Sequence, residues 1–67
     1  MNKKEIVINS KYKVIITYHN DSNIRYYRLE DNQDNTICES YNRDSFLLKA
    51  SKYVKINNNT ECLIASI

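Results

Sequence analysis

The chain contains no glycine, no proline and no tryptophan. Glycine-rich phosphate loops need glycine where the backbone approaches the ligand, so Walker-type and dinucleotide-binding motifs are excluded. The turns must also take their left-handed residues from another residue type, and asparagine, with ten copies, is the expected source. The enriched residue types (Asn, Ile, Lys and Tyr) have A/T-rich codons, which predicts an A/T-rich genome such as that of a low-GC bacterium, a phage or a mobile element.

Long apolar runs are absent as well. The first run, residues 6–8, is too short for a secretory signal or for a membrane span, which needs about 20 residues. We therefore expect a cytoplasmic protein without a membrane partner. In that compartment Cys38 and Cys62 should be reduced thiols. Because two cysteines match no zinc-site spacing, burial in the core is the expected role of both.

No arrangement of residues suggests catalysis. His19 is the only histidine, it lies at the start of a polar turn, and no serine or cysteine is placed to act as its nucleophile. A Cys–His pair would also need a cleft that a chain of 67 residues rarely builds. The expectation is a non-enzymatic protein that binds no cofactor and no metal.

The length of 67 residues predicts one small domain spanning residues 1–67. A chain of this size buries only about 60% of the surface that its unfolded form exposes, so its core is thin. The net charge of +2 disfavours an acidic nucleic-acid mimic and a highly basic chromatin-type protein, although a local basic face stays open.

Alternating apolar residues predict β-strands through the first 41 residues. The clearest strand covers residues 11–18, and a polar turn at residues 19–23 joins it to a strand over residues 24–30 as a hairpin. Every second side chain of the first of these strands shares one face: Tyr12, Val14, Ile16 and Tyr18. The other expected elements are strands at residues 6–8 and 36–41 and a turn at residues 31–35.

Apolar residues at helical spacing predict a short helix over residues 44–53, capped by Asp44 or Ser45. A strand through Phe46 and Leu48 is the competing interpretation. The predicted fold class is mainly β (α+β): a small antiparallel sheet or SH3-like barrel of five to six strands with one short helix around residues 44–53.

A second hairpin is expected at the end of the sequence, with residues 57–59 as its loop. This register places Val54 opposite Cys62 and Lys55 opposite Glu61, so that apolar residues face each other and opposite charges pair. A two-residue loop would mix charged with apolar groups across the strands. In the preferred register Asn59 would take the left-handed conformation.

The most informative feature is the interleaving of tyrosines with basic residues. On adjacent strands this arrangement suits single-stranded nucleic acid, because bases stack on rings while cations bind phosphate. Protein interfaces favour the same residues, since Tyr and Arg dominate their energetic anchors. A third interpretation is packing, with Tyr12, Tyr18 and one of Tyr26 and Tyr27 in the core or at an edge. The candidate partner-binding residues are Arg25, Tyr26, Tyr27, Arg28, Lys11, Lys13, Tyr41 and Arg43.

The leading prediction is a small protein-binding module, such as a phage or mobile-element accessory protein, that inhibits a host or partner protein by steric occupancy. Residues 25–28 would be its anchors. The alternative is a β-barrel protein that binds single-stranded RNA or DNA through the same face with Lys11, Lys13 and Lys52. A further alternative is a self-associating structural protein, a homo-oligomer in which an exposed edge strand pairs with its copy.

Overall fold

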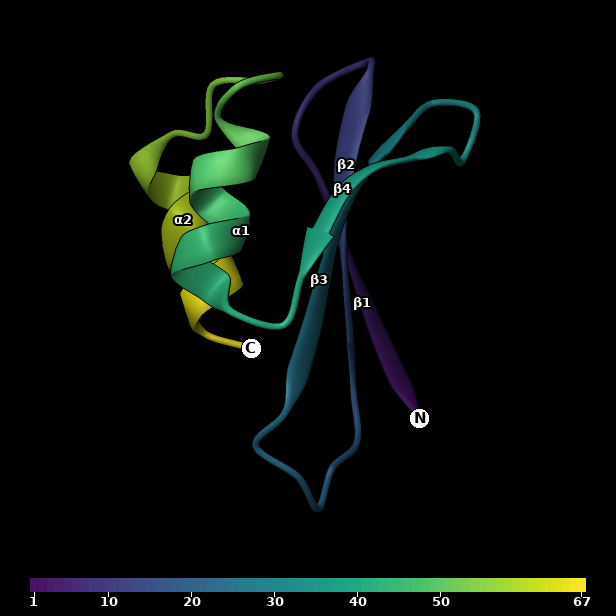
Figure 1. Cartoon of the computed structure of the whole chain (residues 1–67), viewed down its shortest axis with the longest axis vertical. Coiled ribbons are helices and arrows are strands. Elements are labelled where there is room, and N and C mark those ends of the chain that lie inside the picture. Colours follow the sequence, from purple (N-terminus) through teal and green to yellow (C-terminus); the bar gives the residue numbers. More distant parts are fainter.

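The computed structural model describes residues 1–67 and shows a four-stranded antiparallel sheet followed by two helices (Figure 1). The strands are β1 (Asn2–Val7), β2 (Tyr12–Tyr18), β3 (Arg25–Asp31) and β4 (Thr36–Ser40), and the helices are α1 (Arg43–Ala50) and α2 (Asn58–Ala65). The strands lie in the sheet in the same order as in the chain, β1-β2-β3-β4. The α+β class of the prediction is therefore confirmed.

The sheet is open, and the prediction of an SH3-like barrel with five to six strands is wrong. β1 pairs only with β2, and β4 pairs only with β3, so the two edge strands never meet. β4 is also short, with five residues, and its pairing with β3 is interrupted by a register shift between Leu29 and Glu30. Four short strands bury their apolar face more readily under helices than by closing on themselves.

The four strands predicted in the first 41 residues are confirmed, as are the turns that connect them. β1 begins at Asn2, several residues before the predicted start. Its extra residues include Lys3, Lys4 and Glu5, which are exposed because β1 is an edge strand. Because these three consecutive residues are all polar, this part of β1 lacks the alternation of apolar and polar residues from which the other strands were predicted.

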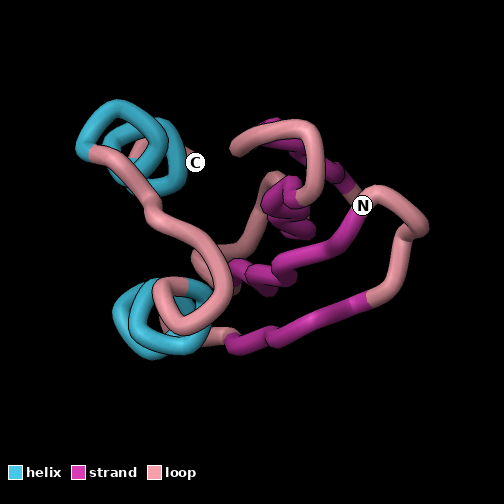
Figure 2. The backbone as a smooth tube through the Cα atoms, turned by 90° about the horizontal axis from the view of Figure 1, so that it is seen from above, coloured by secondary structure: helices cyan, strands magenta, loops and turns pink.

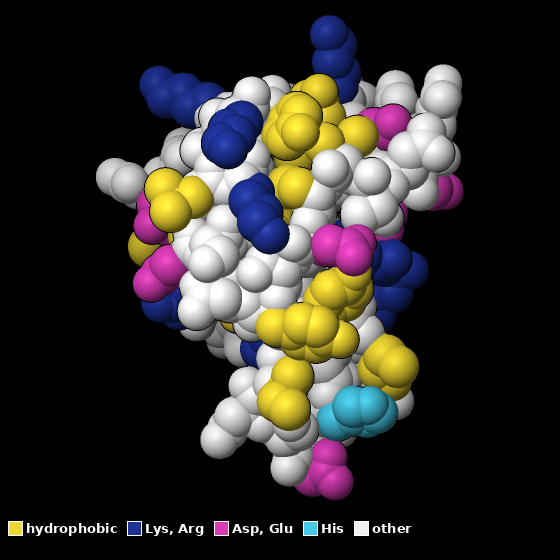
Figure 3. Space-filling model, viewed as in Figure 1, with side chains coloured by type: hydrophobic (Ala, Val, Ile, Leu, Met, Phe, Trp, Pro, Cys, Tyr) yellow, Lys and Arg dark blue, Asp and Glu magenta, His cyan; other side chains and the backbone are white.

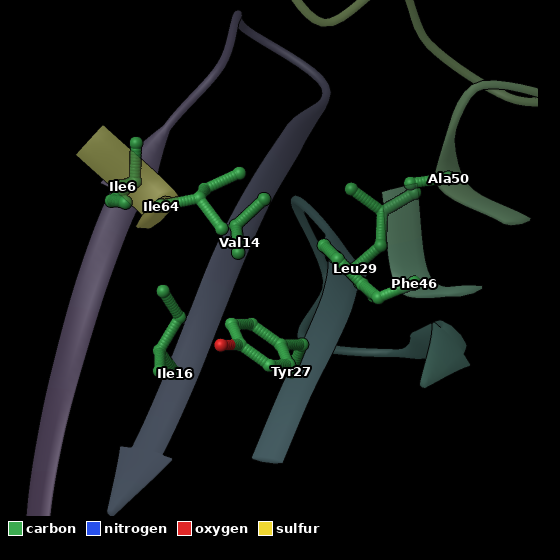
Figure 4. Packing of buried hydrophobic residues seen from close by; sticks show 8 residues of the cluster. All are labelled: Ile6, Val14, Ile16, Tyr27, Leu29, Phe46, Ala50 and Ile64. Carbon is green, nitrogen blue, oxygen red and sulfur yellow. The ribbon is translucent and has the colours of Figure 1, made fainter. Parts of the chain in front are cut away.

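Both helices lie against one face of the sheet, and the other face carries none (Figure 2). The strand faces follow the predicted alternation, because Val14 and Ile16 of β2 belong to the core cluster with Tyr12 and Tyr18 packed against it. Figure 4 shows that side chains of the strands and of both helices meet in the core, between the sheet and the helices. Its members are Ile6, Val14, Ile16, Tyr27, Leu29, Phe46, Ala50 and Ile64.

The predicted helix over residues 44–53 is confirmed as α1, which is shorter and ends at Ala50. Its N-cap is Asn42, whose Oδ1 accepts a hydrogen bond from the Ser45 N–H at 2.9 Å, so the prediction of Asp44 or Ser45 as the cap is wrong. An N-cap side chain must precede the first helical N–H groups that it satisfies. Phe46 faces the sheet, as expected for a helix with one buried side.

The predicted second hairpin is wrong, because residues 58–65 form the helix α2. Asn57 caps it, with Oδ1 accepting a hydrogen bond from the Thr60 N–H at 2.8 Å. The residue pairs on which the predicted hairpin was based do not form, because this part of the chain contains no strand. The apolar face of β1 and β2 instead needs a cover, and Ile64 of α2 supplies it beside Ile6.

Asparagine does not supply the left-handed residues that the lack of glycine seemed to require. Asp34, with φ of 63°, is the only residue with positive φ, and it lies in the β3–β4 turn. Asparagines act at chain reversals through their side chains instead: Asn9 Oδ1 accepts from the N–H groups of Lys11 (2.8 Å) and Tyr12 (3.0 Å). Side chains that bond nearby backbone allow turns without left-handed residues.

Candidate functional site

The β2–β3 hairpin projects beyond the two helices, so this end of the sheet is uncovered (Figure 1). The turn is held by its own atoms: the Ser22 N–H donates to the His19 carbonyl at 3.2 Å, and Ser22 Oγ accepts from the Ile24 N–H at 3.0 Å. β3 begins directly after it. The predicted anchor segment, residues 25–28, therefore begins at the uncovered end and runs toward the helices.

Strand alternation divides the predicted anchor segment between the two faces of the sheet. Tyr27 is buried in the core, where its ring stacks on Phe46 at a centroid distance of 5.6 Å. Arg25 lies on the same face, nearer the hairpin. Tyr26 and Arg28 lie on the opposite face, which carries no helix. The four residues do not form one surface.

Arg25 bonds to the β2–β3 turn and to the last residue of the sequence. Its guanidinium lies 4.5 Å from the centroid of the Tyr18 ring, and its Nε donates to the Ile67 carbonyl at 3.0 Å. Its Nη1 donates to the carbonyls of Ser22 (2.8 Å) and Ile24 (3.1 Å). These bonds leave only Nη2 of the guanidinium for a partner.

The open face of the sheet carries paired charges. Arg28 Nη2 lies 3.3 Å from the carboxylate of Glu30, which is buried, and the guanidinium lies 5.9 Å from the Tyr26 ring centroid. The nearby Glu39 carboxylate, which favours the protonated hydroxyl, raises the pKa of Tyr26 to about 12. Arg28 is thus balanced by an acid inside the fold.

Two more of the predicted cations are also paired with acids. Lys13 Nζ lies 2.7 Å from the Asp34 carboxylate and 3.7 Å from that of Glu5. The hydrogen bond between Lys13 and Asp34 raises the pKa of the lysine and lowers that of the aspartate. Arg43 Nε lies 3.7 Å from the Asp44 carboxylate. The predicted basic face is therefore largely neutralised by its own neighbours.

The last two predicted residues are exposed at opposite ends of the sheet. Lys11 lies in the β1–β2 turn and extends into solvent. Tyr41 follows β4 at the hairpin end, where 70% of its surface is exposed and its ring lies 4.8 Å from that of Tyr26 at a tilt of 39°. The structure thus brings Tyr26 and Tyr41 together and separates them from Lys11.

An apolar surface surrounds this pair of rings, and we call Met1, Ile24, Tyr26 and Tyr41 the hairpin-end patch. Met1 and Ile24 are 84% and 67% exposed. All four line one groove of about 910 Å³ together with hairpin residues and Tyr18. Hydrophobic side chains gather over the hairpin end of the molecule in Figure 3. Among the residues that line the groove, only His19 and Arg25 can carry a side-chain charge.

Sequence reasoning missed Met1 and Ile24 as surface residues. The sequence predicts Ile24 only as the first residue of a strand, and none of the predictions involves Met1. Strand alternation could have predicted the position of Ile24. Ile24, Tyr26 and Arg28 are spaced two residues apart, so their side chains lie on the same face of the sheet. No comparable signal marked Met1, since the start of β1 was not predicted.

The remaining titratable groups form no further site. Cys38 is half-buried, and burial raises the pKa of its thiol, whereas Cys62 is exposed, so the prediction that both are buried is wrong for Cys62. No group of three or more His, Cys, Asp or Glu side chains is arranged to hold a metal ion. Neither helix is long and apolar enough to span a lipid bilayer.

Comparisons with protein-family models, with curated proteins and with solved structures found no match to this chain.

Proposed function

We propose that this protein is a non-enzymatic module that binds another protein through the hairpin-end patch and acts by occupying that partner's surface. The observation that carries the proposal is the gathering of large exposed apolar side chains around one groove at the uncovered end of the sheet. Apolar patches that a small protein leaves exposed favour contact with another protein. The partner surface that fits is apolar at its centre.

The ring pair gives this patch an anchor with a fixed geometry. Tyr26 and Tyr41 already contact each other, with ring centroids 4.8 Å apart. Rings that are ordered before binding lose little conformational entropy when a partner arrives, and tyrosines with this property are frequent anchors of interfaces.

Nucleic-acid binding receives less support from the same surface. Rings that stack on bases must lie beside cations that are available to phosphate. Arg28 is paired with Glu30, Lys13 with Asp34, and Arg25 with backbone carbonyls, so the cations closest to the rings already have partners. At the apolar groove Arg25 keeps its positive charge, but only its Nη2 is free to bind a phosphate.

The test is affinity capture from an extract of the source organism with the wild-type protein and a patch variant that combines Ile24→Asp with Tyr41→Ala. Both residues are exposed, so the variant should stay folded. We expect one protein to be retained by the wild type and reduced at least tenfold by the variant. Far-UV circular dichroism checks that the variant keeps the wild-type fold.

The matched control is Tyr53→Ala, which removes an exposed tyrosine in the turn after α1, away from the patch. It should capture the partner as the wild type does. Equal capture by the wild type and the patch variant would contradict the proposal. So would the recovery of nucleic acid as the retained species, with a yield that falls steeply as salt rises.

A further inference from the structure

β1 is an edge strand whose backbone is open along its outer side. It pairs with β2 alone, in a register that places Ile6 opposite Val14. The Ile8 N–H donates to the Tyr12 carbonyl at 3.0 Å just beyond the strand. In an antiparallel pair the backbone groups of alternate residues point to the same neighbour. The even-numbered residues of β1 therefore bond to β2, and the N–H and C=O groups of Lys3, Glu5 and Val7 point outward.

The other edge of the sheet is less open. β4 has only five residues and is followed within three residues by α1. The carbonyl of Glu39, near the end of β4, accepts a hydrogen bond from Nζ of Lys49 in α1 at 3.2 Å. A lysine that covers a strand edge blocks the addition of another strand. An approaching strand would therefore find a longer free edge at β1.

The side chains on the open face of β1 form a self-complementary series. In order they are Met1, Lys3, Glu5 and Val7: apolar, positive, negative and apolar. Met1 and Val7 are exposed (84% and 69%), although they are large and apolar. A copy that runs antiparallel about Lys4 places Lys3 opposite Glu5 of the second copy and Met1 opposite Val7 of the second copy. Each odd-numbered pair occurs twice by symmetry.

From this series we infer that β1 pairs with β1 of a second copy of this chain, antiparallel and centred on Lys4, and joins two four-stranded sheets into one of eight strands. The paired odd residues exchange backbone hydrogen bonds, because their N–H and C=O groups face the copy. Opposite charges directly across strands stabilise the pairing. Of the N–H groups in β1, those of Lys3, Glu5 and Val7 gain partners in the dimer.

Neighbouring registers are less favourable. A shift of one pair in either direction places Glu5 opposite Glu5 of the second copy, or Lys3 opposite Lys3 of the second copy, on the open face. In the register centred on Lys4, the like charges that face each other are the two Lys4 side chains, one from each copy. These side chains are exposed on the helix face of the sheet. The pairing is therefore strongest where the two salt bridges form, and it should weaken with salt, which screens exposed charges.

The decisive experiment is a charge swap followed by sedimentation over a range of protein concentrations. The wild type should shift toward twice the chain mass of 8.0 kDa as the concentration rises. Lys3→Glu alone and Glu5→Lys alone place like charges opposite each other, and each should weaken dimerisation at least tenfold. Mixing the two variants, or combining both changes in one chain, restores opposite charges at every pair and should restore the dimer.

Lys11→Glu is the matched control, because it makes the same charge change in the β1–β2 turn outside the proposed pairing. It should dimerise as the wild type does. Amide hydrogen exchange gives a second measurement that does not depend on the substitutions: in the dimer Lys3, Glu5 and Val7 should become protected, whereas Lys4 and Ile6 are protected at all concentrations. A wild type that stays monomeric, single variants that dimerise normally, or a mixture that fails to restore the dimer would each overturn the inference.

The two proposals share Met1, which belongs to the hairpin-end patch and lies opposite Val7 of the second copy in the dimer, but the variants that test them change different residues. The patch variant changes Ile24 and Tyr41, neither of which belongs to β1. Loss of partner capture with an intact dimer would leave the strand pairing standing, and loss of the dimer with intact capture would leave the proposed function standing.

Discussion

The tyrosines of this protein have several different roles. Tyr27 stacks on Phe46 in the core, Tyr18 supports the guanidinium of Arg25, and Tyr26 and Tyr41 form an exposed pair. The prediction that tyrosines of β2 and one of Tyr26 and Tyr27 pack in the core or at an edge is confirmed. The role of a tyrosine depends on the face of the sheet on which its side chain lies, and amino-acid composition carries no information about that face.

Asp31 is a residue whose ionisation we expect to affect stability in acid. The backbone N–H groups of Asn35 and Gln33, each 2.9 Å from Oδ1, hold the pKa of this carboxyl below its ordinary value. A lowered pKa in the folded state means that the carboxylate stabilises the fold above the ordinary Asp pKa. This contribution is lost as the pH falls through the lowered value.

Asp31→Asn should therefore make the free energy of unfolding less dependent on pH below about pH 4, because asparagine keeps an acceptor oxygen but does not titrate. Urea unfolding at several pH values between about 2 and 6 measures this slope. An acid dependence equal to that of the wild type would show that Asp31 contributes nothing to it.

At the scale of elements, the two helices begin in the same way. Asn42 and Asn57 each take an extended backbone conformation and accept a hydrogen bond from the N–H three residues later. Each helix has only eight residues, and helices this short are marginal without caps and packing. Part of the asparagine excess thus has a structural use at helix starts.

Asn57→Ala should lower the free energy of unfolding by about 1 kcal/mol, since it leaves the Thr60 N–H without its acceptor. Asn57→Asp should cost much less, because its carboxylate accepts the same bond. Asn58→Ala, which changes the next exposed residue, serves as the control. Chemical denaturation compares the three variants with the wild type, and equal losses for Asn57→Ala and Asn58→Ala would contradict the capping role.

The elements predicted from sequence were those with an internal signal. β2 and β3 carry apolar or aromatic residues two positions apart, although Ile15 interrupts the alternation in β2, and polar clusters mark their turns. α2 lacked such a signal: only Ile64 is buried among its eight residues, so neither a helical nor a strand period stands out. Its state is decided by the apolar face of β1 and β2 that it covers, which is a property of the assembled sheet. The hairpin-end patch was missed for the same reason, because its members come from separate parts of the chain and meet only in the assembled sheet.

At the scale of the whole molecule, the helices cover the upper part of one sheet face and leave the hairpin end bare (Figure 1). The eight-residue cluster is completed by α1 over β3 and β4 and by α2 over β1. Arg25 adds a second link to the C-terminal residues through the Ile67 carbonyl. Both the proposed patch and the proposed strand pairing use surface that this arrangement leaves uncovered.

Deleting residues 58–67 should abolish cooperative unfolding, because it exposes Ile6 and Val14 and removes the Ile67 partner of Arg25. A domain of this size has a total stability of about 3–10 kcal/mol, so a core contact of this kind is a large share of it. Thermal unfolding followed by circular dichroism measures the change. Deleting Ile67 alone should leave a cooperative transition, and a truncated 1–57 chain that still unfolds cooperatively would show that α2 is dispensable.

The order of the sheet has a consequence for how the chain acquires its fold. Each strand pairs with the one made just before it, so the hairpins can assemble through short loop closures, which favours fast folding. The core, however, is sealed only when α2 docks beside β1, the first strand. The meander alone would therefore leave its apolar side open to solvent, and the core is complete only once Ile64 of α2 has docked.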